Sequence, residues 1–379
     1  MIPEKDISLK TNETNNTERI YFPELDGLRF FAFLLVFFHH SKLFIQTPHL
    51  STFHAFSWIG VDLFFVLSAF LFTKLLIAEY DKTKTISFKK FYIRRIFRIW
   101  PIYYLFITFC LLFDIYVNGA TITKYVGVRI IGLFTFSDNL MASIKGFTPV
   151  FSTGHLWTIG YEEQFYVFIP IIIFFLVRAS LKTKIISTVS VFILFNAIRF
   201  FLIANKVPHP AIWVLPITHF EAIIMGIIIG FGGLNFLAKK VKPLILGLIG
   251  ILFFILLTTL PNVDKISYWL ILSYSLVGIS TSMILLSVSN SIYLKRIFSK
   301  QLFVFLGKRS YGLYVYHLLG NYTADNIIKY IPKLPSGSFA VFMYSLAFTI
   351  LIAIISYKVI EKPFLKLKKK FEVIVSRPI

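Results

Sequence analysis

The chain has 379 residues, of which 57% are hydrophobic and only 15% are charged. An ordinary soluble domain carries roughly 25% charged residues, so this composition excludes a soluble globular enzyme, a disordered protein and a collagen-like fibre. The apolar runs approach twenty residues instead of alternating over ten, which predicts an all-α fold, a polytopic membrane helical bundle. Cys110 is the one cysteine, which excludes an intramolecular disulfide and a cysteine-based metal site.

In chain order, the polar segment 1–22 is expected to be a disordered cytosolic tail. Ten apolar spans follow, which predicts about ten transmembrane helices, at 27–45, 56–78, 100–117, 155–178, 184–204, 212–238, 241–260, 266–288, 302–320 and 338–360. The transmembrane domain then covers 23–367. The shorter apolar segment 125–137 is expected to be an extra half-helix that lies on the membrane surface or re-enters it. Residues 368–379 are expected to be a basic cytosolic tail.

The Lys and Arg residues determine the expected orientation. With the N-terminus in the cytosol, 26 of the 39 lie in or beside cytosolic segments and 7 lie in outer segments. The positive-inside rule therefore predicts that both termini are cytosolic. The same distribution accounts for most of the net charge of +21, so we expect no nucleic-acid partner.

Ionisable residues inside membrane spans are costly and usually functional. In the expected topology the cations gather toward the cytosolic side, at Arg29, Arg94, Arg95, Arg98, Lys308 and Arg309. The outer half holds His39, His40, Asp62, His155, Glu162, Glu163, Arg199, His219, Glu221 and His317. The first set suits a polyanionic ligand bound from the cytosol, and the second suits proton transfer. No group has metal-ligand spacing, so we expect no metal.

Arg29 and His40 are eleven residues apart on one expected helix. Eleven residues are almost three full turns, so the two side chains share a face and lie roughly 16 Å apart along the axis. Arginine suits phosphate groups, and histidine suits general-base catalysis near neutral pH. An acyl-coenzyme A, with phosphates at one end and a thioester at the other, would span the pair. The alternative is an arginine that snorkels at the helix end and a buried, hydrogen-bonded histidine.

Six motifs occur in order along the chain. They are Leu25–Arg29 followed by ten residues and His40, then Gly60–Phe70, Arg94–Tyr103, His155–Tyr166, Ser310–His317 and Glu361–Phe364. Together they resemble the motifs of the acyltransferase-3 family of integral membrane O-acyltransferases. Two positions depart from that pattern: Ala69 stands where glycine is usual, and His219 stands before Phe220-Glu221 where the family often has arginine.

The resemblance implies a membrane enzyme that moves an acetyl or other short acyl group from cytosolic acyl-CoA, commonly acetyl-CoA, to a hydroxyl group. The acceptor would be a cell-surface glycan or its lipid-linked precursor, and the location would be the bacterial cytoplasmic (inner) membrane. Since the chain ends soon after the tenth span, we expect no C-terminal esterase-like domain of the SGNH type, which some members carry.

The same resemblance, read together with the residue types, gives each candidate residue a role. His40 would be the base, assisted by Asp62 or Glu162, and Arg29, Arg94, Arg95 and Arg98 would hold the phosphates of coenzyme A. Residues expected to contact the substrate or to support the catalytic groups are His155, Trp157, Glu163, Arg199, Glu221, Ser310, Tyr311 and His317.

Several alternatives stay open at this point. The arginines of 94–98 also fit a contact with anionic lipid headgroups. Asp62 either orients His40 or pairs with Arg199. Adjacent glutamates point to different sides of a helix, so at most one of the two at 162–163 is expected to face the site. His39 is expected to be structural or to support the catalytic groups without touching the substrate. The alternative function is a secondary transporter or flippase for an anionic lipid-linked saccharide, although we find no internal repeats of the kind that many transporters show.

Overall fold

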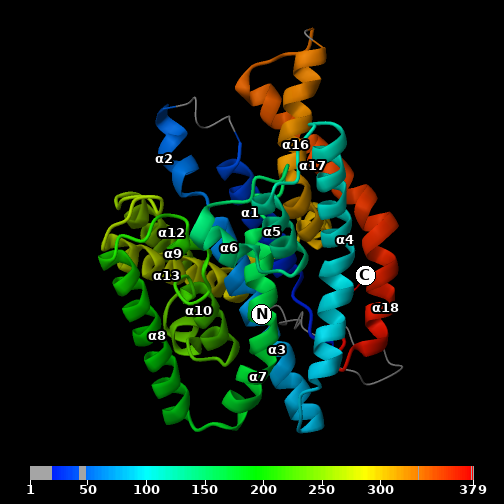
Figure 1. Cartoon of the computed structure of the whole chain (residues 1–379). Coiled ribbons are helices and arrows are strands. Elements are labelled where there is room, and N and C mark those ends of the chain that lie inside the picture. Colours follow the sequence, from blue (N-terminus) through cyan, green and yellow to red (C-terminus); the bar gives the residue numbers. More distant parts are fainter. Residues whose placement is uncertain (1–18, 42–47, 332, 377, 379) are drawn as a thin grey trace.

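The computed structural model describes residues 19–41, 48–331, 333–376 and 378, and within these ranges it is built from helices with no β-strand (Figure 1). Among the described residues, six helical stretches are long and apolar enough to cross a membrane. They are α3 (Ile59–Thr83), α4 (Phe88–Tyr116), α7 (Trp157–Arg178), α8 (Leu181–Ala204), α13 (Trp269–Asn290) and the continuous stretch Ser338–Phe371. The protein is therefore an all-α, multi-pass membrane protein.

Apart from α16 and the elements inside the stretch Ser338–Phe371, the other described helices are shorter than 18 residues. With these included, the other described elements are α1 (Pro23–His39), α2 (Pro48–Phe56), α5 (Lys124–Phe134), α6 (Asp138–Lys145), α9 (Ala211–Val214), α10 (Glu221–Gly230), α11 (Asn235–Lys240), α12 (Pro243–Thr258), α14 (Ile292–Phe298), α15 (Gln301–Lys308), α16 (Ser310–Tyr330), α17 (Ser338–Ser356), η1 (Tyr357–Glu361), α18 (Lys362–Lys368) and η2 (Lys369–Phe371). Residues 1–18 of the expected tail and 42–45 of the first expected span lie outside the described residues.

Two of the ten expected spans are interrupted. The span 212–238 divides into α9, α10 and α11. The helix α9 ends before Pro216, which disfavours a helical conformation at the residue before it. Leu215 is accordingly extended, with ψ of 129°. The break between α10 and α11 contains Gly232 with φ of 82°. The span 302–320 divides into α15 and α16 at Arg309, where φ is −102° and ψ is 6°. The half-helix expected at 125–137 corresponds to α5 and its C-terminal turn.

The arginine-rich motif lies inside a helix and not in a loop. We expected the third span at 100–117, but α4 begins at Phe88 and carries Pro101 in its interior. A proline within a membrane helix removes one backbone hydrogen bond, which neighbouring helices help to compensate. As a result Arg94, Arg95 and Arg98 are held on one helix, with Arg95 about 100° around the axis from Arg94 and Arg98 nearly one full turn after Arg95.

Glycines allow α1 to approach α14 and α15 closely. A Cβ atom on Gly27 would collide with the backbone carbonyl of Phe298, and one on Gly307 would collide with that of Asp26. Glycine is the residue that permits such close contact between backbones. This packing fixes the start of α1, and therefore Arg29, beside the beginning of α16.

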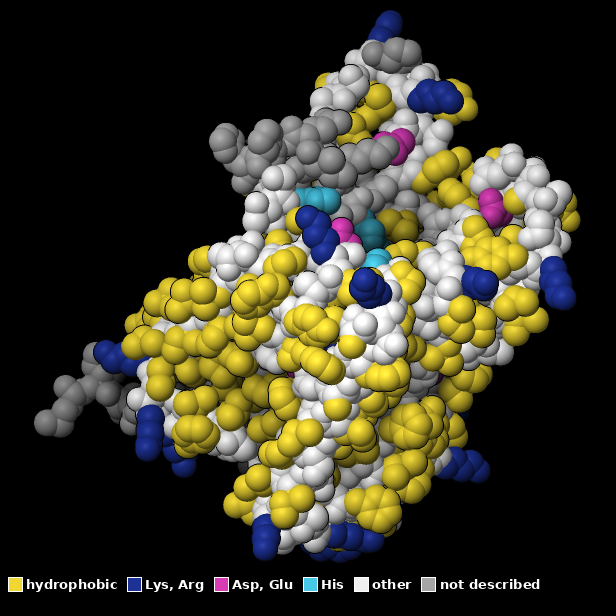
Figure 2. Space-filling view, turned by 60° about the vertical axis from the view of Figure 1, so that its left-hand side comes forward, with side chains coloured by type: hydrophobic (Ala, Val, Ile, Leu, Met, Phe, Trp, Pro, Cys, Tyr) yellow, Lys and Arg dark blue, Asp and Glu magenta, His cyan; other side chains and the backbone are white. Residues whose placement is uncertain are grey.

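The outer surface has the character expected for contact with lipid. Hydrophobic side chains cover the broad middle of the face shown in Figure 2, and many of the Lys and Arg side chains lie toward its margins. On α8, Ile193 is 61% exposed and Phe201 is 65% exposed. In a soluble protein such a continuous apolar surface would drive aggregation, whereas hydrocarbon chains of a bilayer can cover it without cost.

Candidate active site

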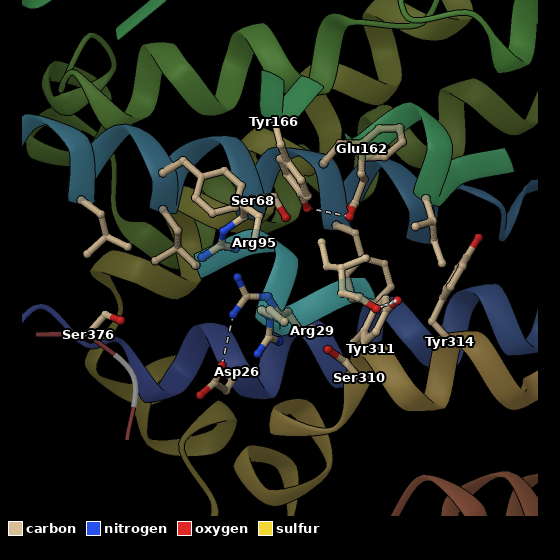
Figure 3. A pocket seen from close by; sticks show the side chains of 18 of the residues that line it. Asp26, Arg29, Ser68, Arg95, Glu162, Tyr166, Ser310, Tyr311, Tyr314 and Ser376 are labelled. Atoms are coloured by element: carbon tan, nitrogen blue, oxygen red, sulfur yellow. Dashed lines mark hydrogen bonds and ion pairs between the residues drawn. The ribbon is translucent and has the colours of Figure 1, made fainter. Parts of the chain in front are cut away.

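An elongated cavity of about 160 Å³ lies between α1, α3, α4, α7 and α16 (Figure 3). The face of α3 that lines it includes Val61, Phe64, Phe65 and Ser68, at the three- and four-residue spacing of one helical side. From the C-terminal end of the chain, Lys368 and Ser376 also reach the cavity. In Figure 3, Ser376 and Tyr314 lie at opposite ends of the view, with Arg29 and Arg95 between them.

One part of this cavity is cationic. Arg29, Arg95, Arg98 and Lys368 line it, against two carboxylates, Asp26 and Glu162. The Nη1 atom of Arg29 is 3.1 Å from Oδ1 of Asp26, and Arg95 stacks 4.6 Å above the ring of Phe72. Four cations against two anions leave a net positive charge within a mostly apolar enclosure, which favours an anionic ligand.

Arg94 does not line this cavity, although the sequence motif places it in the same cluster. Its Nη1 atom donates to the carbonyl oxygen of Phe371 at 2.8 Å, and its Nη2 atom lies 3.4 Å from Oε2 of Glu79. The reason is the helical rotation between adjacent residues, which turns Arg94 away from Arg95. Three of the four expected phosphate-binding arginines are thus brought together in the cavity.

The two adjacent glutamates on α7 separate in the same way. Glu162 lines the cavity and accepts a hydrogen bond from the hydroxyl of Tyr166 at 2.6 Å. Glu163 accepts from Nε1 of Trp100 at 3.4 Å and is not among the cavity-lining residues. Glu162 is therefore a carboxylate of the arginine-containing cavity, and among the described contacts it has none with His40.

The end of the cavity away from Ser376 is formed by α16. Ser310, Tyr311 and Tyr314 line it, and the Tyr311 hydroxyl donates to the carbonyl of Ile99 at 2.9 Å. The hydroxyl of Tyr314 donates to the carbonyl of His155 at 3.1 Å and lies 2.6 Å from Oγ1 of Thr158. Tyr314 thereby joins the cavity to a cluster of histidines.

The histidine cluster consists of His40, His317 and His155. The ring centroids of His40 and His317 are 4.9 Å apart, and those of His317 and His155 are 4.6 Å apart. The rings of His155 and His317 lie 5.3 and 5.5 Å from the ring of Tyr314. The cluster thus adjoins the cavity through a single aromatic side chain.

The backbone carbonyl groups beside the histidine rings show which ring nitrogen carries the proton, because a carbonyl oxygen can only accept a hydrogen bond. Nδ1 of His40 is 3.0 Å from the carbonyl of Val36, so it carries the proton, and Nε2 is left with the lone pair. Nδ1 of His317 likewise donates to the carbonyl of Tyr314 at 2.5 Å. Nε2 of His317 is then an acceptor and receives a shared hydrogen bond from Nδ1 of His40 at 3.3 Å. His40 therefore has a basic Nε2 atom.

His155 is oriented from the neighbouring helix. Its Nε2 atom donates to the carbonyl of Val315 at 3.2 Å, and its buried Nδ1 atom has no hydrogen-bond partner within the described structure. His39 is directed elsewhere, because its Nδ1 atom donates to the carbonyl of His54 at 3.2 Å. This is the separation expected from adjacent positions of one helix.

Asp62 forms a different pair from either of the two that we expected. Its Oδ1 atom lies 2.7 Å from Nε2 of His219, and both side chains are about 1% exposed. Val61 faces the cavity. Asp62 is the next residue and is rotated by about 100° around the helix axis, so it faces α9 and α10 instead. The other ring nitrogen of His219 is also engaged, since Nδ1 is 3.0 Å from the carbonyl of Trp213.

Arg199 forms an ion pair with Glu221, in which Nη2 of Arg199 is 2.6 Å from Oε1 of Glu221. Nε of Arg199 also donates to the carbonyl of Thr218 at 2.8 Å. Trp157 packs against Trp213, with ring centroids 5.5 Å apart. These residues lie with His219 in a buried cluster on the far side of α3, and the structure does not bring Arg199, Glu221 or Trp157 into the cavity.

Several cavity residues escaped the sequence reasoning: Ser68, Thr158, Tyr166, Tyr314, Lys368 and Ser376. Helical spacing could have found some of them. Thr158, Glu162 and Tyr166 recur every four residues, and Tyr314 lies four residues after Ser310, so each set shares a helix face.

Comparison with known proteins identifies the family of the chain. The family model described as "Acyltransferase domain" (Acyl_transf_3) matches residues 22–358. The chain is 30% identical over 363 residues to a Staphylococcus aureus strain COL protein named "Putative O-acetyltransferase", covering 91% of this chain and 58% of that protein. It is 28% identical over 364 residues to "O-acetyltransferase OatA" of Staphylococcus aureus strain NCTC 8325 / PS 47, covering 91% of this chain and 57% of that protein.

The chain thus spans somewhat over half the length of these relatives, and no solved structure matches it. The family match extends from the residue before α1 into η1, and so the chain belongs to the acyltransferase-3 family.

Proposed function

We propose that this protein is an O-acyltransferase that moves an acetyl or other short acyl group from acyl-CoA to a hydroxyl of a cell-surface glycan or its lipid-linked precursor. The observation that carries the proposal is the position of Tyr314. It closes one end of a cavity that contains Arg29, Arg95 and Arg98, and its hydroxyl and carbonyl groups contact His155 and His317. A cationic cavity for an anionic donor therefore adjoins a histidine base.

The cavity supports the choice of donor. Coenzyme A carries phosphates that match guanidinium groups through charge-assisted, bidentate hydrogen bonds. Its uncharged pantetheine arm would extend along Phe64, Phe65 and Tyr311 toward Tyr314. The thioester would then lie at the end of the cavity that adjoins the histidines.

In the proposed reaction the acceptor oxygen attacks the thioester carbonyl carbon, and the C–S bond breaks. Nε2 of His40 takes the hydroxyl proton as the C–O bond forms, and the resulting imidazolium then gives this proton to the departing thiolate of coenzyme A, so that no net proton is released. Proton transfer of this kind by a positioned base typically contributes 10²–10⁴-fold to a rate. The shared hydrogen bond from His40 to His317 and Val36 would hold the ring in the tautomer that this step requires.

The membrane orientation belongs to the same proposal. The arginine-containing end of the bundle would face the cytosol and the His40 end would face outward, across the bacterial cytoplasmic membrane, with both termini cytosolic. The distribution of Lys and Arg along the chain supports this. A reporter that fluoresces only in the cytosol, fused after Ile379, should give a signal. A dark fusion at normal expression would contradict the orientation.

The test of the function combines binding and product analysis. Purified full-length protein in detergent should bind coenzyme A, measured by isothermal titration calorimetry, and should hydrolyse or exchange radiolabelled acetyl-CoA slowly without an acceptor. In cells, glycans from a deletion strain should lack O-acetyl esters that return on complementation, which mass spectrometry can detect. A protein that moves lipid-linked saccharide but neither binds coenzyme A nor turns over acetyl-CoA would instead support the transporter interpretation.

A further inference from the structure

The residues at 368–376, here called the C-terminal segment, lie against the arginine-containing end of the cavity. The carbonyl of Phe371 accepts from Nη1 of Arg94 at 2.8 Å, and the ring of Phe371 lies 5.9 Å from that of Phe97. The carbonyl of Val375 accepts from the backbone N–H of Ile20 at 3.0 Å. The segment is thus attached both to α4 and to the chain just before α1, and it forms part of the cavity wall.

Lys368 is the charged residue that this segment contributes to the cavity. It is 9% exposed, whereas the adjacent Lys369 and Lys370 are exposed. Lysine is rarely buried to this extent, so a lysine in the wall brings a cation to the cavity. Its Nζ atom is 3.6 Å from Oε1 of Glu372, which is longer than a well-formed charge-assisted hydrogen bond of about 2.7–2.9 Å.

We propose that Lys368 binds a phosphate group of the acyl-CoA donor, exchanging Glu372 for the phosphate, so that the C-terminal segment is part of the donor site. This inference rests on the proposed function, because it assumes that coenzyme A occupies the cavity. No covalent step is involved: one ion pair inside the protein is replaced by an ion pair with the ligand.

The spread of charge in the cavity supports this inference. Coenzyme A carries a diphosphate and a separate phosphate on its ribose, so its charges need cations at more than one place. Arg29 and Arg95 lie near each other in the middle of the view in Figure 3, while Ser376 marks the side reached by the C-terminal segment. Lys368 and Ser376 both line the cavity, and a lysine and a hydroxyl group are common partners of phosphate.

A purely structural role predicts a different pattern. If Lys368 and Glu372 only stabilise the end of the chain as an i, i+4 pair, then removing either charge breaks the same contact, and both changes should have effects of the same sign. If Lys368 binds phosphate, the two changes should act in opposite directions, because Glu372 competes with the ligand and repels it.

The experiment measures coenzyme A affinity of the full-length protein in detergent for K368Q, K368R, E372Q and the exposed control K369Q, with thermal unfolding of each. We expect K368Q to weaken binding about tenfold, the order expected for one hydrogen bond to a charged group. We expect K368R to retain most of the affinity, E372Q to tighten binding severalfold, and K369Q to match the wild type. Should K368Q fail to fold, tighter binding by E372Q relative to K369Q still supports the proposal.

Two results would overturn it. One is equal affinity of K368Q and K369Q in a protein whose binding still depends on Arg29, which rejects the role of Lys368 and leaves the proposed function intact. The other is weaker binding in both K368Q and E372Q with a lower unfolding temperature, which indicates a structural pair. If the wild-type protein does not bind coenzyme A, the proposed function fails and this inference fails with it.

Discussion

His317 accepts a hydrogen bond from His40 at a distance of 3.3 Å, between Nε2 of His317 and Nδ1 of His40. In Ser-His-Asp triads a carboxylate occupies the corresponding position and stabilises the imidazolium that forms. Here the partner is a neutral imidazole whose own Nδ1 proton is engaged by the carbonyl of Tyr314. The arrangement orients His40 and fixes its tautomer, with less electrostatic stabilisation than a carboxylate would give.

His40→Ala should abolish acyl transfer while leaving coenzyme A affinity nearly unchanged. His40 is outside the set of residues that line the cavity, so it should contribute little to donor binding. Loss of a general base typically costs 10²–10⁴-fold in rate. The measurement is acetyl transfer in cells together with coenzyme A binding by the purified variant.

The matched control is His39→Ala, because His39 is adjacent in sequence but bonded to the carbonyl of His54. It should retain transfer. A folded His40→Ala protein that binds donor and acetylates at nearly the wild-type rate would remove His40 from the mechanism, and an inactive His39→Ala protein would reassign the base.

His317→Gln should lower the turnover rate by roughly tenfold to a hundredfold without changing the affinity for coenzyme A. Glutamine can still accept a hydrogen bond, but its longer, flexible side chain would hold the His40 ring less firmly, and orientation is a large part of catalysis. A fall in kcat with constant KM for acetyl-CoA identifies a positioning role. An equal loss of unfolding temperature and activity, with kcat per folded molecule unchanged, would indicate that His317 is only a packing residue.

Arg29→Ala and Arg95→Ala should each weaken coenzyme A binding by about tenfold to a hundredfold, as expected for loss of about 1.5–3 kcal/mol from one charge-assisted contact. Arg94→Ala should have a smaller effect, because Arg94 bonds to Phe371 and Glu79 outside the cavity. The three variants, compared by calorimetry at one ionic strength, test the geometry directly. Arg94→Ala as the most damaging change would contradict the assignment of the phosphate site.

Tyr314→Ala should uncouple donor hydrolysis from transfer. Removing the ring would open the wall between the cavity and the histidines, and water admitted there competes with the acceptor for the thioester. Acetyl-CoA hydrolysis without an acceptor should therefore rise relative to transfer. Tyr314→Phe is the control, because it keeps the wall and removes only the hydroxyl bonded to His155 and Thr158. Equal hydrolysis by both variants and wild type would show that Tyr314 does not separate donor from water.

The features that the sequence could predict are those that depend on spacing along one helix, although the shared role of Arg29 and His40 in one reaction stays a prediction. The membrane bundle, the pairing of Arg29 with His40 on one helix and the divergence of Glu162 and Glu163 all follow from apolar length and the rotation of 100° per residue. The partner of Asp62 could not be predicted, because it is 157 positions away and depends on how α3 faces α10. The same holds for Lys368, since the contact between the C-terminal segment and α4 has no signal in either segment alone.

The pair of Asp62 and His219 should contribute to stability more than to the chemical step. Neither residue lines the cavity, both are about 1% exposed, and the ring of His219 stacks on Trp213 with centroids 4.6 Å apart. Asp62→Asn and His219→Gln should each lower the free energy of unfolding by about 1–3 kcal/mol, because each leaves a buried polar group with a poorer partner. Coenzyme A affinity should stay within about twofold of the wild type for variants assayed below their unfolding temperature.

The double variant separates a direct pair from two independent effects. Since either single change already disrupts the same contact, the second should add little, and the combined loss should fall short of the sum of the two single losses. Thermal unfolding in one detergent, followed for the wild type, both single variants and the double variant, gives this coupling. Additive losses would show that the two side chains stabilise the fold separately. A turnover rate that falls a hundredfold in Asp62→Asn, with stability and donor affinity intact, would return Asp62 to the catalytic machinery and would mean that its contact with His219 opens during the reaction.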